Sequence, residues 1–211
     1  AALDIQSFGG RGITIHPRPD ERHIRYQDAR DLKKVVTTEF NIEGNPIPEF
    51  VDLVLDIKPD QVTLVPDAVD AITSNAGWNT AEHESFLTEV VSEFKRNGIR
   101  TSIFMDPVPS LIEKAADTGT DRIELYTESY AVQYAKGNKD EVRKYTEAAL
   151  KATEFGLGIN AGHDLSLDNL NFFVSEVPDV LEVSIGHALI SEALYLGLEN
   201  VIGMYLQKLA Q

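Results

Sequence analysis

The chain has 211 residues and a formal net charge of −15 at pH 7, with 43% hydrophobic and 25% charged residues. This composition is typical of one globular domain, and the acidic balance argues against a nucleic-acid surface, which is normally basic. The sequence contains no cysteine, which excludes disulfides, thiolate metal sites and cysteine nucleophiles. No apolar run approaches the ~20 residues of a membrane span. We therefore expect a single domain over residues 1–211 in the cytoplasm.

Short β-branched or aromatic runs alternate with longer helical patterns along the chain. Residues 1–10 read as the end of a helix that stops at glycine. The predicted strands are 12–18, 39–44, 61–67, 100–106, 122–127, 157–164 and 180–187. The predicted helices include 48–57, 81–96, 110–116, 141–155, 168–176 and a last helix over 191–209. Such alternation indicates parallel strands joined by crossover helices.

Seven strands can be counted, whereas a closed TIM (β/α)8 barrel has eight. Because the chain opens on a helix end, we expect the first strand and most of the first helix to be missing from this chain. An open, doubly wound sheet would also fit seven strands, but no glycine-rich dinucleotide fingerprint supports it. The sequence therefore predicts an α/β fold, a TIM barrel that lacks its N-terminal β/α unit.

The predicted strands have one apolar and one polar face. In the strand 39–44, Phe40 and Ile42 alternate with Glu39, Asn41 and Glu43. We expect the apolar faces to pack on the helices and the polar faces to lie inside the barrel, which would make the interior unusually polar for this fold. A one-sided antiparallel sheet is the alternative, and the long intervening helices disfavour it.

Histidines gather where the active sites of such barrels form, at the C-terminal ends of the strands. Because imidazole titrates near neutral pH, this clustering favours acid–base chemistry over unrelated structural roles. The four at or just beyond predicted strand ends are His16, His23, His163 and His187. The fifth, His83, lies in a helical pattern and is predicted to be on the surface.

Two glutamates, Glu43 and Glu124, lie on the polar faces of their strands. A carboxylate inside a barrel must be paired, hydrogen-bonded or protonated. Burial could therefore raise the pKa of Glu43 toward a value useful for acid–base catalysis. The alternative that the sequence leaves open is a structural ion pair with Arg18 or Arg122, and Glu124 has the same ambiguity.

A glycine stands beside a histidine at the ends of the last two predicted strands, in Gly162-His163 and Gly186-His187. Backbone N–H groups at a helix start bind anions, and barrels often place a phosphate site there. Turn geometry alone is the alternative reason for these glycines.

All ten lysines fall in predicted helices or loops, so a Schiff-base lysine is disfavoured and any imine would need an amine from a substrate.

Two further features suit a phosphate-binding site. Arg18 could clamp a second anionic group, or form an ion pair at the rim with Asp20 or Glu21. Residues 67–80, which include Thr73, are long enough to form a lid, and an ordinary surface loop is the equal alternative.

Together these motifs resemble those of the pyridoxine 5′-phosphate synthase family. Residues 12–24 (GITIHPRPDERHI) resemble its second-strand signature, and residues 41–43, 65–66, 159–163 and 185–188 match further motifs in the same order. The resemblance implies that 1-deoxy-D-xylulose 5-phosphate joins 3-amino-2-oxopropyl phosphate to give pyridoxine 5′-phosphate, with no metal or organic cofactor. The family opens with a strand to which no part of this chain corresponds. Its members form octamers, so we expect a homo-oligomer of the intact protein.

The resemblance also implies roles for individual residues. His16 would be a general base, Glu43 a second acid–base group and His163 a proton donor, while Glu124 would stabilise charge in a transition state. Contacts to substrate and phosphate would come from Arg18, His23, Thr73, the backbone at Asp164, and the pair Gly186 and His187.

Two other functions remain alternatives. One is a metal-dependent barrel hydrolase with His16, His163, His187 and Glu43 as ligands, although the His-X-His usual on the first strand of such enzymes is not found. The other is a non-catalytic protein that binds phosphorylated sugars, which would have little need for Glu43.

Overall fold

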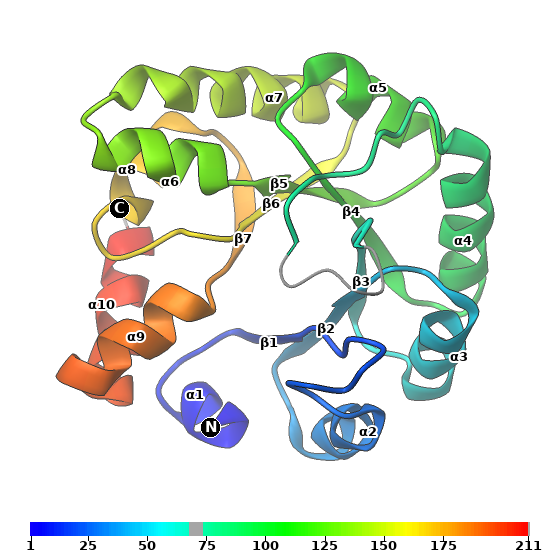
Figure 1. Ribbon diagram of the computed structural model, residues 1–211, viewed down its shortest axis with the longest axis horizontal. Coiled ribbons are helices and arrows are strands. Elements are labelled where there is room, and N and C mark those ends of the chain that lie inside the picture. Colours follow the sequence, from blue (N-terminus) through cyan, green and yellow to red (C-terminus); the bar gives the residue numbers. More distant parts are fainter. Residues whose placement is uncertain (68–73, 211) are drawn as a thin grey trace.

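The computed structural model describes residues 1–67 and 74–210. Its centre is one parallel sheet whose seven strands follow chain order, so that β1 and β7 are the two edges of a nearly closed barrel (Figure 1). The strands are β1 (Gly12–Ile15), β2 (Glu39–Gly44), β3 (Gln61–Leu64), β4 (Arg100–Met105), β5 (Arg122–Tyr126), β6 (Gly158–Gly162) and β7 (Val180–Ser184). The predicted α/β barrel architecture is confirmed.

Helices surround the sheet on its outer side (Figure 1). They are α1 (Ala2–Ser7), α2 (Tyr26–Val35), α3 (Pro48–Ile57), α4 (Glu84–Arg96), α5 (Pro109–Asp117), α6 (Glu128–Ala135), α7 (Val142–Glu154), α8 (Leu170–Glu176), α9 (His187–Leu196) and α10 (Leu198–Leu209), with a short 3-10 helix, η1 (Lys139–Glu141). No helix in the described part of the chain is both long and apolar enough to cross a membrane.

Local sequence accounts for most of these elements. In α4, the buried side chains Leu87, Val90, Val91 and Phe94 recur at helical spacing and form its inner face. Gly98 follows this helix with a φ of 76°, a left-handed conformation in which glycine is favoured, and so turns the chain into β4.

The prediction of one terminal helix over 191–209 is wrong. Helix α9 begins earlier, at His187, and α10 begins at Leu198. Between them Gly197 has φ 83° and ψ 142°, which is far from helical geometry and breaks the helix in two.

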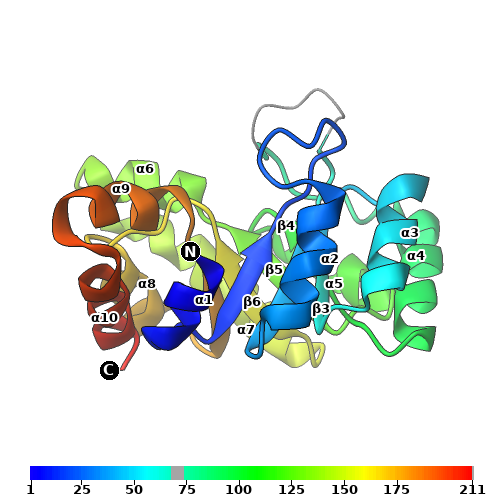
Figure 2. The ribbon, with the colours of Figure 1, turned by 90° about the horizontal axis from the view of Figure 1, so that it is seen from below.

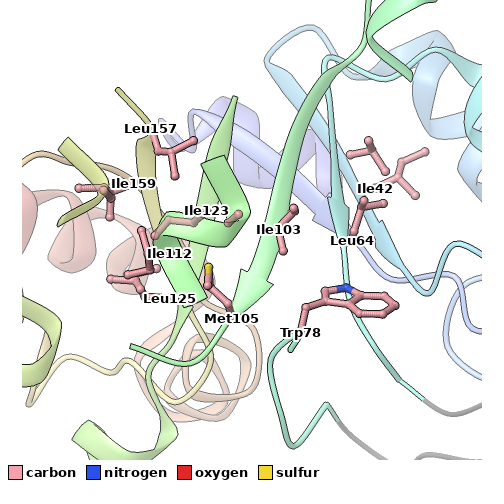
Figure 3. Packing of buried hydrophobic residues seen from close by; sticks show 14 of the residues in the cluster. Ile42, Leu64, Trp78, Ile103, Met105, Ile112, Ile123, Leu125, Leu157 and Ile159 are labelled. Carbon is pink, nitrogen blue, oxygen red and sulfur yellow. The ribbon is translucent and has the colours of Figure 1, made fainter. Parts of the chain in front are cut away.

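The apolar faces of the strands point outward and form the main core with the helices (Figure 3). Ile42, Leu64, Ile103, Ile123 and Ile159, from five successive strands, are almost completely buried. Each such side chain contributes about 1.5–3 kcal/mol through removal of its apolar surface from water. This outward packing leaves the other face of every strand for the barrel interior.

The interior is polar, as predicted. Arg100 on β4 pairs with Glu39 on β2, and its guanidinium lies 3.5 Å from Glu182 on β7. These contacts cross from one side of the sheet to the other, which requires that the three side chains point inward. Near them, Arg122 pairs with the same Glu182 and donates to Asn160 at 3.1 Å. Opposite charges thus compensate one another at the N-terminal end of the barrel.

Candidate active site

The predicted site residues lie at one end of the barrel, where the strands finish. Apart from 39–44, which matches β2, the predicted strands run too far at their C-terminal ends: β1 stops at Ile15 and β6 at Gly162. His16 and His163 therefore lie just beyond the pairing, in the connections that follow the strands. In the side view, the connection from β1 to α2 rises from this end of the sheet (Figure 2).

A chain of buried polar side chains leads into this end of the barrel. The Nδ2 atom of Asn41 lies 3.4 Å from Thr14 Oγ1 and 3.5 Å from Glu43 Oε1. The hydroxyl of Thr63 lies 3.2 Å from Asn41 Oδ1 and 3.5 Å from Glu124 Oε2. These groups come from β1, β2, β3 and β5. Glu43 and Glu124 thus form the deep part of the site.

Space for Glu124 depends on Gly162. A Cβ atom at position 162 would lie 2.0 Å from Glu124 Oε1, which is far inside van der Waals contact. The glycine of the 159–163 motif therefore has a packing role that its position at a strand end did not reveal. It leaves the interior open for a carboxyl group from the neighbouring strand.

Burial favours the protonated form of both glutamates. Glu43 is 8% exposed and Glu124 is 1% exposed. Loss of hydration, together with the negative charge of Asp67, raises the pKa of Glu43 to about 7. Burial, then the nearby Glu43 and Glu182, raises the pKa of Glu124 well above its ordinary value. The structure thus supplies carboxyl groups that can hold a proton near neutral pH.

His16 lies between two carboxyl groups at the mouth of the barrel. Its Nδ1 is 4.0 Å from Glu43 Oε2, and its Nε2 is 3.8 Å from Asp67 Oδ2. Burial and the positive charge of Arg18 lower the pKa of His16 to about 4, although Asp67 acts in the opposite direction. The imidazole is therefore neutral at pH 7 and can accept a proton.

Arg18 pairs with Asp67, its NH1 lying 3.0 Å from Asp67 Oδ2. The sequence offered Asp20 or Glu21 as its partner at the rim, but Asp20 pairs with Arg22 and the Glu21 carboxylate accepts from a backbone N–H. Asp67 is a site residue that sequence reasoning missed. It follows β3 as His16 follows β1, and this position after a strand is the signal that could have identified it.

The contacts of the described residues do not include the structural ion pairs that the sequence allowed for Glu43 and Glu124. Arg122, one suggested partner, pairs with Glu182, and Arg18 pairs with Asp67. Neither arginine is within ion-pair distance of Glu43 or Glu124 among the salt bridges of the described residues.

His163 occupies an aromatic corner of the site. Its ring centroid lies 5.1 Å from that of Phe104 and 5.3 Å from that of Tyr126. Its backbone has φ 71°, and its carbonyl oxygen accepts a hydrogen bond from the Thr127 hydroxyl, which holds this uncommon conformation. Burial lowers the pKa of His163, so this ring also favours the neutral form.

The other expected binding residues surround this centre at the surface. His23, Asp164, Gly186 and His187 are exposed, and His187 is the first residue of α9. Asp164 has φ 54°. Thr73 lies outside the described residues, and His83 is on the surface as predicted.

The ligand set of a metal-dependent hydrolase is not formed by the residues that the structure describes. Within them, no three His, Asp or Glu side chains are arranged to hold one metal ion. The arrangement instead brings a neutral imidazole, two protonatable carboxyl groups and a buried arginine–aspartate pair to one opening.

Solved structures of similar shape support the architecture alone, since their sequences differ widely from this one. A 3-keto-L-gulonate-6-phosphate decarboxylase from Vibrio cholerae matches with a TM-score of 0.68 and 8% identity, over 98% of this chain and 88% of that one. A phosphoribosylanthranilate isomerase from Thermotoga maritima matches with a TM-score of 0.63 and 12% identity, over 98% of this chain and 91% of that one. The fold and the site together thus define a (β/α)-barrel enzyme.

Sequence comparison gives the family. The model of the pyridoxal phosphate biosynthesis protein PdxJ matches residues 1–211. A pyridoxine 5′-phosphate synthase of Flavobacterium johnsoniae is 71% identical over 99% of this chain and 88% of its own length. The pyridoxine 5′-phosphate synthase of Cytophaga hutchinsonii is 64% identical over 99% of this chain and 87% of its own length. The chain belongs to the PdxJ family, which confirms the resemblance read from its motifs.

Proposed function

We propose that this protein joins 1-deoxy-D-xylulose 5-phosphate to 3-amino-2-oxopropyl phosphate and closes the ring of pyridoxine 5′-phosphate, releasing inorganic phosphate and water. The observation that carries the proposal is the position of His16, neutral at pH 7, beside the protonatable Glu43 at the barrel mouth. Family membership and the names of relatives at 71% and 64% identity support it.

The reaction needs several proton transfers and no lysine, because the amine belongs to a substrate. No lysine lies in any of the seven strands. His16 would take the first proton as a general base. Glu43, with a pKa of about 7, would both accept and donate protons in later steps. His163 would donate a proton, and Glu124 would stabilise charge that develops deep in the barrel.

Each substrate carries a phosphate, so two anion sites are needed. Arg18 would bind one group, with help from His23 and Thr73. The backbone at Asp164 and the exposed start of α9, at Gly186 and His187, would bind the other. In this proposal the substrates' own functional groups and the protein's side chains suffice, without a metal or an organic cofactor.

We propose that the protein is a cytoplasmic homo-oligomer, an octamer. Large apolar side chains on α9 support an assembly: Leu194 is 80% exposed and Tyr195 is 90% exposed. Such exposure is costly in water and is usually covered by a partner. Light scattering coupled to size-exclusion chromatography measures the assembly directly, and a monomer at micromolar concentration would contradict this part of the proposal.

A coupled assay tests the reaction. Protein expressed from the complete gene is given both phosphorylated substrates, and inorganic phosphate and the fluorescent pyridoxine product are followed together. We expect product only when both substrates are present. Glu43→Gln should reduce turnover at least ~100-fold, as removal of a general acid–base group does. The matched control, Glu113→Gln on the exposed side of α5, should retain wild-type turnover.

The same experiment separates the alternatives. Binding of both substrates without any product, unchanged in Glu43→Gln, would favour a binding protein. Phosphate released from a single substrate, together with zinc or manganese retained after dialysis, would favour a hydrolase.

A further inference from the structure

Asp67 is a buried carboxylate to which the proposed reaction gives no role so far. It lies just beyond β3 and is 7% exposed. One oxygen, Oδ2, accepts from Arg18 at 3.0 Å and from the Ser74 hydroxyl at 2.8 Å. The same oxygen is 3.8 Å from His16 Nε2. Three groups that come from two separate loops therefore meet at a single carboxylate oxygen.

The backbone holds this carboxylate in place. The carbonyl oxygen of Asp67 accepts a hydrogen bond of 2.6 Å from Asn45 Nδ2, which follows β2. A buried charge with fixed partners is a rigid reference point, because moving the carboxylate away from its hydrogen-bond donors would leave it buried without compensation at a large cost. The carboxylate thus fixes the positions of its neighbours relative to the barrel.

The two nitrogens of His16 face different carboxyl groups. Nδ1 faces Glu43 Oε2 at 4.0 Å, and Nε2 faces Asp67 Oδ2 at 3.8 Å. Both distances exceed a direct hydrogen bond, and such contacts commonly tighten when a substrate closes the site. In a neutral imidazole only one nitrogen carries hydrogen, and the stronger neighbouring acceptor selects which one.

We propose that Asp67 is a positioning residue of the synthase site: it orients the Arg18 guanidinium toward a substrate phosphate and holds His16 as the tautomer with hydrogen on Nε2, so that unprotonated Nδ1 faces Glu43. This inference rests on the proposed function. It makes Nδ1 the proton-accepting atom of His16 and explains why a carboxylate is buried beside a phosphate-binding arginine.

The charge of Asp67 also acts on the proton-transfer pair. The titratable and charged groups that face His16 are Glu43, Asp67, Arg18, Arg22 and His163; those that face Glu43 are His16, Asp67, Glu124 and Arg18. In both sets Asp67 raises the pKa of the group it faces. Removal of its charge therefore lowers the pKa of both His16 and Glu43. The pH profile of kcat/KM should move to lower pH, whichever protonation states are active.

The test compares Asp67→Asn, which keeps the shape and removes the charge, with Asp67→Glu, which keeps the charge. Wild type and Ser74→Ala, which removes one hydroxyl donor to the carboxylate, are assayed beside them. For Asp67→Asn we expect the KM of one phosphorylated substrate to rise ~10-fold or more, the loss of a charge-assisted contact. Its kcat/KM profile should move by about one pH unit to lower pH. Asp67→Glu should restore the wild-type position of the profile.

A second measurement is made on the wild type and does not depend on how the Asp67 variants fold. Nitrogen NMR of histidine-labelled wild type at pH 7 distinguishes the two imidazole tautomers, with His16→Gln identifying the signal. Hydrogen on Nε2 supports the inference, and hydrogen on Nδ1 overturns it. A folded Asp67→Asn variant with unchanged KM and an unchanged pH profile of kcat/KM also overturns the inference. So does an Asp67→Asn variant that loses activity while its pH profile stays at the wild-type position. Absence of turnover in wild type would instead refute the proposed function.

Discussion

Replacing Glu43 by glutamine should remove a pH dependence from the stability of the fold. Burial, followed by the charge of Asp67, raises the carboxyl pKa in the folded protein from an ordinary 4.5 to about 7. The folded state then holds this proton more tightly than the unfolded chain does. The resulting stability is fully present below pH 4.5 and is lost as the pH rises through about 7. Each pKa unit corresponds to about 1.4 kcal/mol, so the loss amounts to about 3 kcal/mol.

This loss is a large fraction of the 5–15 kcal/mol by which domains are typically stable, so it should be measurable. Urea unfolding at about pH 5 and about pH 8 gives the free energy of unfolding for wild type, Glu43→Gln and the exposed control Glu113→Gln. Near pH 5 the three proteins should agree within about 1 kcal/mol. Near pH 8 Glu43→Gln should exceed the other two by up to about 3 kcal/mol. An equal difference at both pH values would refute the argument from burial.

Two further substitutions test the mouth of the barrel. Gly162→Ala would place a Cβ 2.0 Å from the buried Glu124 carboxyl, so we expect a loss of about 1–3 kcal/mol in urea unfolding together with reduced turnover. Gly203→Ala in α10 is the control that should not be destabilised, because apart from neighbouring residues and the nearby backbone of its own helix nothing lies within 4 Å of the new Cβ. Asp164→Gly should relieve the left-handed backbone at φ 54°, raising stability by up to about 1 kcal/mol. It also removes a negative charge beside a proposed phosphate site, so the KM of one substrate should fall; a rise in KM would contradict that placement.

Much of the architecture could be predicted because its determinants are local. Alternation with a period of two residues identified strands and their faces, and Phe40 and Ile42 point to the core while Asn41 and Glu43 point inside. Helices with a clear apolar stripe, such as α3 and α4, were predicted close to their observed bounds. Helix α2 was not singled out, because its apolar stripe is narrow: Tyr26, Ala29 and Leu32 face the core, and of these only Ala29 is fully buried.

The candidate site could be predicted in outline for a related reason. In a parallel barrel every strand ends at the same rim, so polar residues at strand ends must gather there. His16 and Glu43 were found in this way, and the motifs that contain them matched those of one family in the same order. The sequence by itself thus determined the sheet, the polar interior, the rim and the family.

Only the tertiary structure decided which of these residues are partners. Arg18 could have paired with Asp20, two residues away, yet it pairs with Asp67, which is 49 residues away in sequence and lies beyond another strand. The pKa of Glu43 depends on burial and on that same distant carboxylate. Gly162 is needed because Glu124 reaches across from the adjacent strand. Such relations depend on distances between side chains from different strands, and a pattern within one strand carries no information about them.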